Sequence, residues 1–352
     1  MELSAKELKQ YSRHILLKEI GTSGQQKLKN SSVLVIGAGG LGCPILSYLT
    51  ACGIGRIGII DFDIVEQSNL QRQVLYSESD IGLPKVEVAS RKLCKLNSLV
   101  NFDLYNQKLT KLNAVELFSK YDIVVDGSDN FSTRYLVNDA AILVNIPLVY
   151  GSIYKFEGQV SVFNYNNGPT YRCLYPKKTD LKDGLNCSES GVMGTLAGII
   201  GSMQANEVIK IICGVGDIMS GKLLIIDSLS LKQSIIKFQK NESNQINELE
   251  EDYENCSSNY FEEITLKEIK KLVGRYELLD VRTDFERNEL NIGGIHIPLN
   301  DLSSRCNEIP SKNPIIVYCK SGVRSLHAID YLKRKGFKNQ LINLKGGILN
   351  SE

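Results

Sequence analysis

Residues 31–53, "SSVLVIGAGGLGCPILSYLTACG", decide the predicted fold. Residues 31–36 form a short apolar run rich in β-branched side chains, glycines follow at once, and an apolar pattern continues to residue 53. This order predicts a strand, a tight turn and a helix. Apolar runs at 56–63 and 121–130 also end in acidic residues. We therefore predict an α/β fold with a doubly wound parallel sheet, whose ligands bind at the carboxyl ends of the strands.

A change of composition divides the 352 residues into two predicted domains. Residues 238–259 are rich in Asn, Glu and Ser and nearly lack aliphatic runs, which is typical of a linker. Beyond this segment the alternation of strand and helix patterns starts again, which predicts a second, smaller α/β domain. The predicted boundaries are 1–240 for the first domain, 241–259 for the linker and 260–352 for the second domain.

The charge balance and the cysteine content restrict the possible partners and the compartment. Lys and Arg number 41 against 40 Asp and Glu, so no overall basic field exists to attract nucleic acid. The nine cysteines include no C-x-x-C pair, which favours free thiols in a reducing compartment. The N-terminus lacks the apolar core of a signal peptide, and polar residues interrupt the apolar stretch 194–216. We expect a cytoplasmic protein that binds neither nucleic acid nor membrane.

The glycine-rich turn predicts a nucleotide site. Gly37, Gly39 and Gly42 satisfy the pattern G-x-G-x-x-G between a predicted strand and a predicted helix. Glycines permit the tight turn, and the helix N-terminus offers N–H groups to a phosphate. Asp61 ends the next strand, where its carboxylate can bind a ribose hydroxyl. The alternative interpretation is a glycine turn that only lets a helix pack closely on a strand.

The residues beyond this turn bear on which nucleotide binds. A nicotinamide dinucleotide fits the glycine pattern, but Arg72 and Lys85 follow closely in the sequence, and two fixed cations favour a polyphosphate. Either of them alone is better explained as part of a solvated basic surface. Asp126 and Asp129 end the third predicted strand. Carboxylates beside phosphates indicate a magnesium ion, because like charges otherwise repel.

Several motifs in order resemble a known family. They are "YSRHILL", "GAGGLGCP", "DFDIVEQSNLQRQ", "IGLPKVE", "DGSDNFSTRYLVND" and "YRCLYP". Residues 4–240 closely resemble the ubiquitin-activating-like adenylyltransferases of the HesA/MoeB/ThiF family, which serve molybdopterin synthase and thiamine thiazole synthesis. The resemblance implies a Rossmann-like sheet of the ubiquitin-activating type that binds ATP and magnesium.

The resemblance also assigns residues to this site. Asp129 would hold magnesium, Asp61 the ribose, and Arg13 would reach the active site of the other subunit of a homodimer. The expected nucleotide contacts are Gly37, Gly39, Gly40, Gly42, Asp61, Ser68, Asn69, Gln71, Arg72, Lys85, Asp129 and Asn130. Adenylation asks a carboxylate to attack a phosphate, so preplaced cations and magnesium stabilise the developing charge. The expected catalytic residues of this domain are Arg13, Arg72, Lys85 and Asp129, with Cys187 considered next.

Two cysteines of the first domain have specific interpretations. Cys187 lies in a polar loop that in some members of the resembling family carries a cysteine that accepts the acyl group; a free surface thiol is the alternative. Family members usually bind a structural zinc ion through two C-x-x-C pairs. Here Thr170 stands in place of the first cysteine before Cys173, and the region of the second pair has none. We expect no zinc, and packing or hydrogen bonding in its place.

Cys319 ends a predicted strand and precedes the loop "KSGVRS" and a helix. Such a loop can form an anion-binding nest of N–H groups at a helix N-terminus, and a phosphatase loop looks similar. Together with "LLDVR", "NIGGIHIPLNDL" and "LKGGI", residues 260–352 resemble a rhodanese domain. The resemblance implies that Cys319 carries sulfur as a persulfide and that Arg324 closes the loop around it. Family members commonly have a tryptophan after the "GGI" turn, whereas this chain has no Trp.

These interpretations together predict one activity. The first domain would adenylylate the C-terminal glycine of a ubiquitin-like sulfur-carrier protein ending in Gly-Gly, and the second would supply sulfur from Cys319 to form a thiocarboxylate. A cysteine desulfurase or another donor would charge Cys319. The sequence leaves open whether the carrier belongs to the molybdopterin or the thiamine pathway. A NAD-dependent oxidoreductase and a non-catalytic scaffold for ubiquitin-like proteins are the alternatives from other classes.

Overall fold

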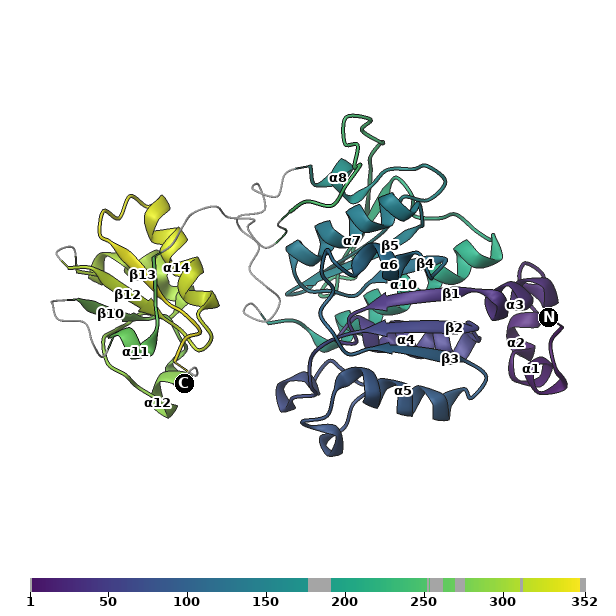
Figure 1. The fold of residues 1–352 in the computed structure, drawn as a ribbon, viewed down its shortest axis with the longest axis horizontal. Helices are drawn as coiled ribbons and strands as arrows, with labels where there is room; N and C mark the ends of the chain where they lie inside the picture. Colours follow the sequence, from purple (N-terminus) through teal and green to yellow (C-terminus); the bar gives the residue numbers. More distant parts are fainter. Residues whose placement is uncertain are drawn as a thin grey trace. The chain divides into compact units, whose positions relative to one another are not determined.

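The structure is a computed structural model that describes residues 2–176, 191–251, 253, 262–269, 276–310 and 313–348. The chain forms two compact units, Met1–Cys256 and Ser257–Glu352. Figure 1 shows the purple-to-green colours of the sequence in the first unit and the green-to-yellow colours in the second. Each unit has its own sheet. This agrees with the expectation of two α/β domains.

The first unit contains an eight-stranded sheet in the order β3-β2-β1-β4-β5-β6-β7-β8. Strands β3 to β5 pair in parallel, and β5 to β8 pair antiparallel. The strand order reverses between β1 and β4, where ligands of such sheets bind. The bounds are β1 Ser32–Ile36, β2 Arg56–Ile60, β3 Asn101–Tyr105, β4 Ile123–Asp126, β5 Leu148–Tyr154, β6 Glu157–Phe163, β7 Lys222–Asp227 and β8 Gln233–Lys237.

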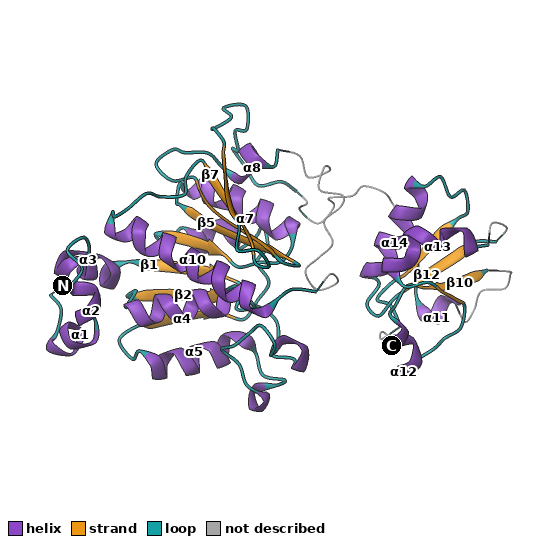
Figure 2. Cartoon of the chain, turned by 180° about the vertical axis from the view of Figure 1, so that it is seen from behind, coloured by secondary structure: helices purple, strands orange, loops and turns teal. Residues whose placement is uncertain are grey.

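Helices cover both faces of this sheet, as Figure 2 shows. One apolar core joins β1 and β2 to side chains of α4, α5 and α10, and a second joins the opposite face to α6 and α7. This arrangement confirms the predicted doubly wound fold. The helices are α1 Ala5–Gln10, α2 Ser12–Ile15, α3 Gly21–Asn30, α4 Gly42–Cys52, α5 Lys85–Leu96, α6 Ala114–Phe118, α7 Phe131–Val144, α8 Tyr171–Leu174 and α10 Gly194–Cys213, with short 3₁₀ turns Gln67–Asn69 and Glu78–Asp80.

Helix α10 is long and apolar enough, by length and composition, to cross a membrane. In this fold it packs against α4 and against strands β5 and β6. Leu196, Ala197 and Ile200 on its inner face are fully buried. The helix therefore belongs to the core of the first unit, as its interrupted apolar pattern predicts.

The second unit is a parallel five-stranded sheet in the order β11-β10-β12-β13-β9. Apolar clusters lie on the two faces of this sheet. The strands are β9 Glu262–Ile264, β10 Glu277–Asp280, β11 Ile295–His296, β12 Ile315–Tyr318 and β13 Leu341–Leu344. The helices are α11 Leu266–Ile269, α12 Asp284–Glu289, α13 Leu302–Arg305 and α14 Val323–Arg334, with 3₁₀ turns Leu299–Asp301 and Cys306–Glu308.

The segment expected as a linker, 241–259, differs from that expectation over its described part. Residues 241–251 and 253, here called the connector, belong to the first unit. Leu249 and Tyr253 pack against the core beside α6 and α7. Two apolar anchors in a polar segment are enough to hold it, although the average composition of the segment hides them. The chain therefore leaves the first unit later than residue 240.

Candidate active site

The glycine turn joins β1 to α4 in the way that its sequence predicts. Gly37 has φ +87°, a conformation that side chains with a Cβ rarely adopt. A Cβ at Gly42 would lie 2.1 Å from the carbonyl oxygen of Gly37, so only glycine lets the helix start this close to the strand. The Ala38 N–H donates to Asp61 Oδ2 at 2.7 Å. The turn is thus fixed against the carboxylate expected to bind ribose.

A cavity of about 670 Å³ lies at the carboxyl ends of the parallel strands. The loops that follow β1, β2, β3 and β4 all line it. A cavity of this volume can hold a nucleotide. The lining brings together these residues predicted from the sequence: Gly37, Gly39, Gly40, Asp61, Arg72, Lys85, Asp129 and Asn130.

Two cations approach this cavity from different elements. Lys85 begins α5 and is only 5% exposed, and its Nζ lies 2.9 Å from Asp63 Oδ2. Arg72 is held by a hydrogen bond from Nη1 to the Ser68 carbonyl at 3.1 Å. The Asp63 carboxylate that pairs with Lys85 is half exposed, so Lys85 can also contact a phosphate while it keeps this partner. Lys85 and Arg72 therefore provide positive charge at the cavity before a ligand arrives.

Three carboxyl groups lie at the same sheet edge but differ in their surroundings. Burial raises the pKa of Asp61, and the nearby Lys85 opposes that rise. Burial likewise raises the pKa of Asp126, whose Oδ2 has no hydrogen-bond partner among the described residues. Asp129 is exposed to the cavity. One exposed carboxylate, with phosphate oxygens as the other ligands, fits the coordination that magnesium prefers.

Helix α7 presents its N-terminus to the cavity. Asn130 is the N-cap, and its Oδ1 accepts the Thr133 N–H at 2.9 Å. Thr133 and Arg134 also line the cavity. The positive end of the helix dipole and the Arg134 guanidinium add to the attraction for an anion. Arg134 was not predicted; its place one helical turn after Asn130 is the signal that would have found it.

Other predicted residues lie outside the cavity lining or outside the described residues. Ser68 and Asn69 sit in the turn that supports Arg72, and Gln71 contacts Gly194 at the start of α10. Gly42 packs against the carbonyl group of Gly37 within the glycine turn. Arg13 is exposed on α2. Cys187 lies outside the described residues. Among the described residues, no group of three or more His, Cys, Asp or Glu forms a metal cluster.

Cys173 is surrounded by hydrogen-bond donors. Its sulfur accepts the Thr170 N–H at 3.4 Å and the Asn241 N–H at 3.3 Å. Asn244 follows Asn241 by three residues, the same spacing that separates Thr170 from Cys173. Burial raises the pKa of the Cys173 thiol, but hydrogen bonds from these three residues outweigh burial and lower it. A polar cluster thus joins α8 to the start of the connector.

In the second unit, Cys319 follows β12 directly and is fully buried. Its sulfur accepts the Gly322 N–H at 3.1 Å and lies 3.6 Å from Ser325 Oγ. Gly322 is the N-cap of α14 with φ +92°. The loop therefore curls around the sulfur at a helix N-terminus, where N–H groups stabilise a negative charge.

Arg324 connects this loop to α12. Its guanidinium donates two hydrogen bonds to Glu286, at 2.7 Å and 2.6 Å. Hydrogen bonds from Arg324 first, and also from Thr283, lower the pKa of Glu286 to about 2 against the opposing effect of burial. The sequence did not single out Glu286, because no motif marks it. The Arg324 side chain is thereby held at one end of the cysteine loop.

Two family models match the chain. The ThiF family model matches residues 11–248, more than half of the chain.

The chain belongs to the ThiF family.

The model of the rhodanese-like domain matches residues 265–350. The first unit is therefore a ThiF domain and the second a rhodanese-like domain, as the motifs of both predicted. The ThiF match extends into the connector, in agreement with the assignment of residues 241–248 to the first unit.

Three relatives match almost the whole chain. The probable adenylyltransferase/sulfurtransferase MoeZ of Mycobacterium tuberculosis is 40% identical and covers 99% of this chain and 93% of its own. The probable molybdopterin-synthase adenylyltransferase of Porphyra purpurea is 39% identical and covers 98% and 93%. The adenylyltransferase and sulfurtransferase MOCS3 of Aedes aegypti is 40% identical and covers 95% and 83%. These relatives confirm the predicted enzyme class, an adenylyltransferase with sulfurtransferase activity.

Solved structures agree with the fold of the ThiF domain. E. coli MccB with succinimide matches with a TM-score of 0.60 and 27% identity, over 66% of this chain and 71% of its own. E. coli MccB with ATP matches with a TM-score of 0.57 and 27% identity, over 63% and 68%. The family assignment favours ATP over the nicotinamide dinucleotide that the glycine pattern alone allows.

Proposed function

We propose that this enzyme adenylylates the C-terminal glycine of a ubiquitin-like sulfur-carrier protein and then converts it to a thiocarboxylate with sulfur from Cys319. The observation that carries the proposal is the joining of two sites in one chain. The chain contains a cationic cavity in its ThiF domain and a cysteine loop in its rhodanese-like domain. Relatives named for both activities match 99% and 95% of this chain.

The first step needs charge stabilisation more than proton transfer. A carboxylate oxygen of the carrier attacks the α-phosphorus of ATP, the bond from that phosphorus to the bridging oxygen breaks, and pyrophosphate leaves. The carboxylate is already ionised, so a general base is not needed. Arg72 and Lys85 line the cavity; in this proposal they face the phosphate oxygens on which negative charge grows, and cations already in position would lower the barrier.

Magnesium fits this site through Asp129. Its carboxylate is exposed in the cavity, and Asn130 Nδ2 lies 3.5 Å from Asp129 Oδ1. A magnesium ion bound there would neutralise phosphate charge as pyrophosphate departs. Asp61 would accept hydrogen bonds from the ribose, because its carboxylate is fixed by the Ala38 and Asp63 N–H groups at 2.7 and 2.8 Å.

The second step uses the persulfide of Cys319. The terminal sulfur attacks the acyl carbon of the adenylate, AMP leaves, and an acyl disulfide forms between the carrier and Cys319. A second thiol then attacks the Cys319 sulfur, so that the carrier leaves as a thiocarboxylate and a disulfide remains. Cys187 is our candidate for this thiol or for direct acyl transfer. The Gly322 N–H donates to Cys319 Sγ at the N-terminus of α14, a position that would stabilise the negative charge of the persulfide before it attacks.

Several further features belong to the proposal. Arg13, exposed on α2, would complete the site of the other subunit of a homodimer. The donor would be a cysteine desulfurase or a related protein that carries persulfide sulfur. The chain would bind no structural zinc ion, and the hydrogen bonds around Cys173 would hold this region instead. The free thiols of the described residues suit the reducing cytoplasm. The carrier would come from the molybdopterin pathway, with the thiamine carrier as the alternative.

The test is ATP–pyrophosphate exchange measured with each of the two purified carriers. We expect exchange that requires magnesium and a carrier with its C-terminal Gly-Gly intact, and that is faster with the molybdopterin-type carrier. A carrier lacking the last glycine is the matched control. Exchange without any carrier, or none with either carrier, would contradict the proposal.

A further inference from the structure

The connector lines the nucleotide cavity. Glu251 and Tyr253 contribute to the same cavity as the glycine turn and the residues Arg72 and Lys85. Tyr253 is only 6% exposed, so it forms part of a packed wall. The segment of chain that leads out of the ThiF domain thus helps to enclose the ligand of that domain.

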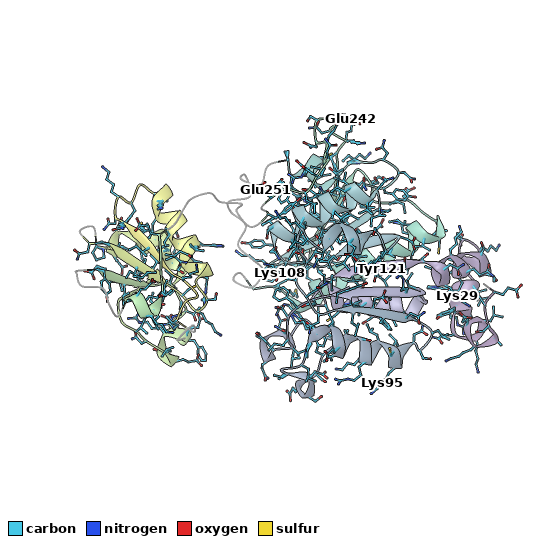
Figure 3. All side chains as sticks on the ribbon, viewed as in Figure 1. Lys29, Lys95, Lys108, Tyr121, Glu242 and Glu251 are labelled. Carbon is cyan, nitrogen blue, oxygen red and sulfur yellow. The ribbon has the colours of Figure 1, made fainter. Side chains whose placement is uncertain are left out.

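The strand order indicates which end of the cavity the connector closes. Asp61 ends β2 and the glycine turn follows β1, while β3 lies on the other side of β2. With ribose at Asp61 and phosphates at the glycine turn, the base lies toward the loop after β3. Residues 107–111 of that loop line the cavity. Figure 3 labels Lys108 of this loop and Glu251 of the connector, both of which line the cavity.

Direct bonds join the connector to the base end. Lys111 Nζ donates to the Glu251 carbonyl oxygen at 2.8 Å. The Tyr253 hydroxyl donates to Asp139 Oδ2 at 2.7 Å and accepts the Glu250 N–H at 3.1 Å. Asp139 lies on α7, the helix whose N-terminus carries Asn130 at the cavity. The connector is therefore fixed to the loop after β3 and to α7, both of which contribute residues to the cavity lining.

A buried ion pair strengthens this attachment. Arg172 of α8 donates from Nε and Nη2 to the two carboxylate oxygens of Asp139, at 2.8 and 2.7 Å. The same guanidinium pairs with Glu250 of the connector. Asp139 is fully buried, and its carboxylate accepts hydrogen bonds from Arg172, from Tyr253 of the connector and from Asn138. Displacing the connector would leave a buried charge less well bonded, which is costly.

We infer that the connector is a positioning element for the nucleotide: Tyr253 and Glu251 close the base end of the cavity, and nucleotide binding and connector docking stabilise each other. This inference rests on the proposed use of ATP. Coupling between two equilibria is reciprocal, so a nucleotide that contacts the docked connector must hold it in place by the same factor. Formation of the adenylate changes the ligand in the cavity and would thus change how firmly the connector is docked. The connector is the start of the segment that leads to the rhodanese-like domain.

The test combines hydrogen exchange and calorimetry on the full-length chain, with magnesium and the non-hydrolysable analogue α,β-methylene-ATP. We expect the analogue to slow amide exchange in peptides covering residues 245–253. Tyr253→Phe removes the hydroxyl that donates to Asp139 and accepts the Glu250 N–H; the bond to the carboxylate alone is worth at least about tenfold in an equilibrium. This variant should speed exchange in the free protein and weaken analogue binding about 3- to 10-fold. Tyr165→Phe, outside the cavity lining in the same unit, is the matched control.

A second variant covers the case in which Tyr253→Phe fails to fold. Lys111 is exposed, so Lys111→Ala should fold normally while freeing the Glu251 carbonyl. Lys95→Ala, exposed on α5 and shown in Figure 3, is its control. Faster connector exchange in Lys111→Ala and not in Lys95→Ala supports the inference. If the analogue binds but amide exchange in the connector is unchanged, this inference is refuted and the proposed function is not. Failure of the wild-type chain to bind the analogue refutes the proposed function as well.

Discussion

The ion pair between Arg324 and Glu286 leads to a quantitative prediction about the loop that holds Cys319. Glu286→Gln keeps the shape of the side chain but removes its charge and one acceptor oxygen. The shift in the pKa of Glu286, from its ordinary value of 4.5 to about 2, corresponds to at most about 3 kcal/mol. The two side chains are 19% and 21% exposed, and solvent screening reduces this to about 1–2 kcal/mol. We expect that loss in the stability of the rhodanese-like domain.

The same loss should appear in catalysis, because Arg324 lies at one end of the loop that holds Cys319. About 1–2 kcal/mol corresponds to a roughly 5- to 30-fold slower transfer of sulfur from thiosulfate to cyanide by the full-length chain. Glu308→Gln is the matched control, since Arg305 and Glu308 form a similar two-bond pair that is 40% and 50% exposed. The control should leave both quantities unchanged. Equal losses in the two variants, or none in Glu286→Gln, would refute this reasoning.

Four further predictions test other parts of the account. Asp129→Ala should slow ATP–pyrophosphate exchange at least about 100-fold, because magnesium and phosphate charge are no longer balanced; exchange within twofold of wild type would contradict this. Cys319→Ala should preserve exchange and abolish thiocarboxylate formation, and a loss of both would show that the two steps are not separate. Glu286 has a lowered folded-state pKa, so its stabilisation is fully present above pH 4.5 and is lost as the pH falls through about 2; the difference in unfolding free energy between wild type and Glu286→Gln should therefore be constant from pH 8 to pH 5 and shrink below that, and a difference that grows on acidification would overturn it. The purified chain should contain no stoichiometric zinc by elemental mass spectrometry, and EDTA should not lower its melting temperature, since hydrogen bonds surround Cys173; one zinc ion per chain would disprove this.

Much of the fold could be predicted because its signals are local. The apolar run of β1, the glycine turn and the apolar start of α4 follow one another within residues 31–53. The same holds for β12, Cys319 and α14 in the second unit. The connector could not be predicted, because its attachment depends on Asp139 and Arg172, which lie 114 residues before Tyr253 and 78 residues before Glu250. The connector is polar on average, so its composition does not reveal that Leu249 and Tyr253 pack against the core.

The candidate site was predictable where the residues belong to long motifs. Asp61, Arg72, Lys85 and Asp129 all lie in such motifs, and the structure brings them to one cavity. The base end was missed because the loop after β3 carries no motif, and its role follows only from the strand order. Glu286 was missed for a related reason. Its partner Arg324 is distant in sequence, so only the folded structure pairs them.

The most direct test of the central claim is the intact mass of the sulfur-carrier protein after incubation with this enzyme, ATP, magnesium and a persulfide donor. We expect a carrier whose mass has increased by the replacement of one oxygen by one sulfur, and no such species with Cys319→Ala. A carrier of unchanged mass, while ATP is converted to AMP and pyrophosphate, would contradict the claim that both activities of the chain act on one substrate.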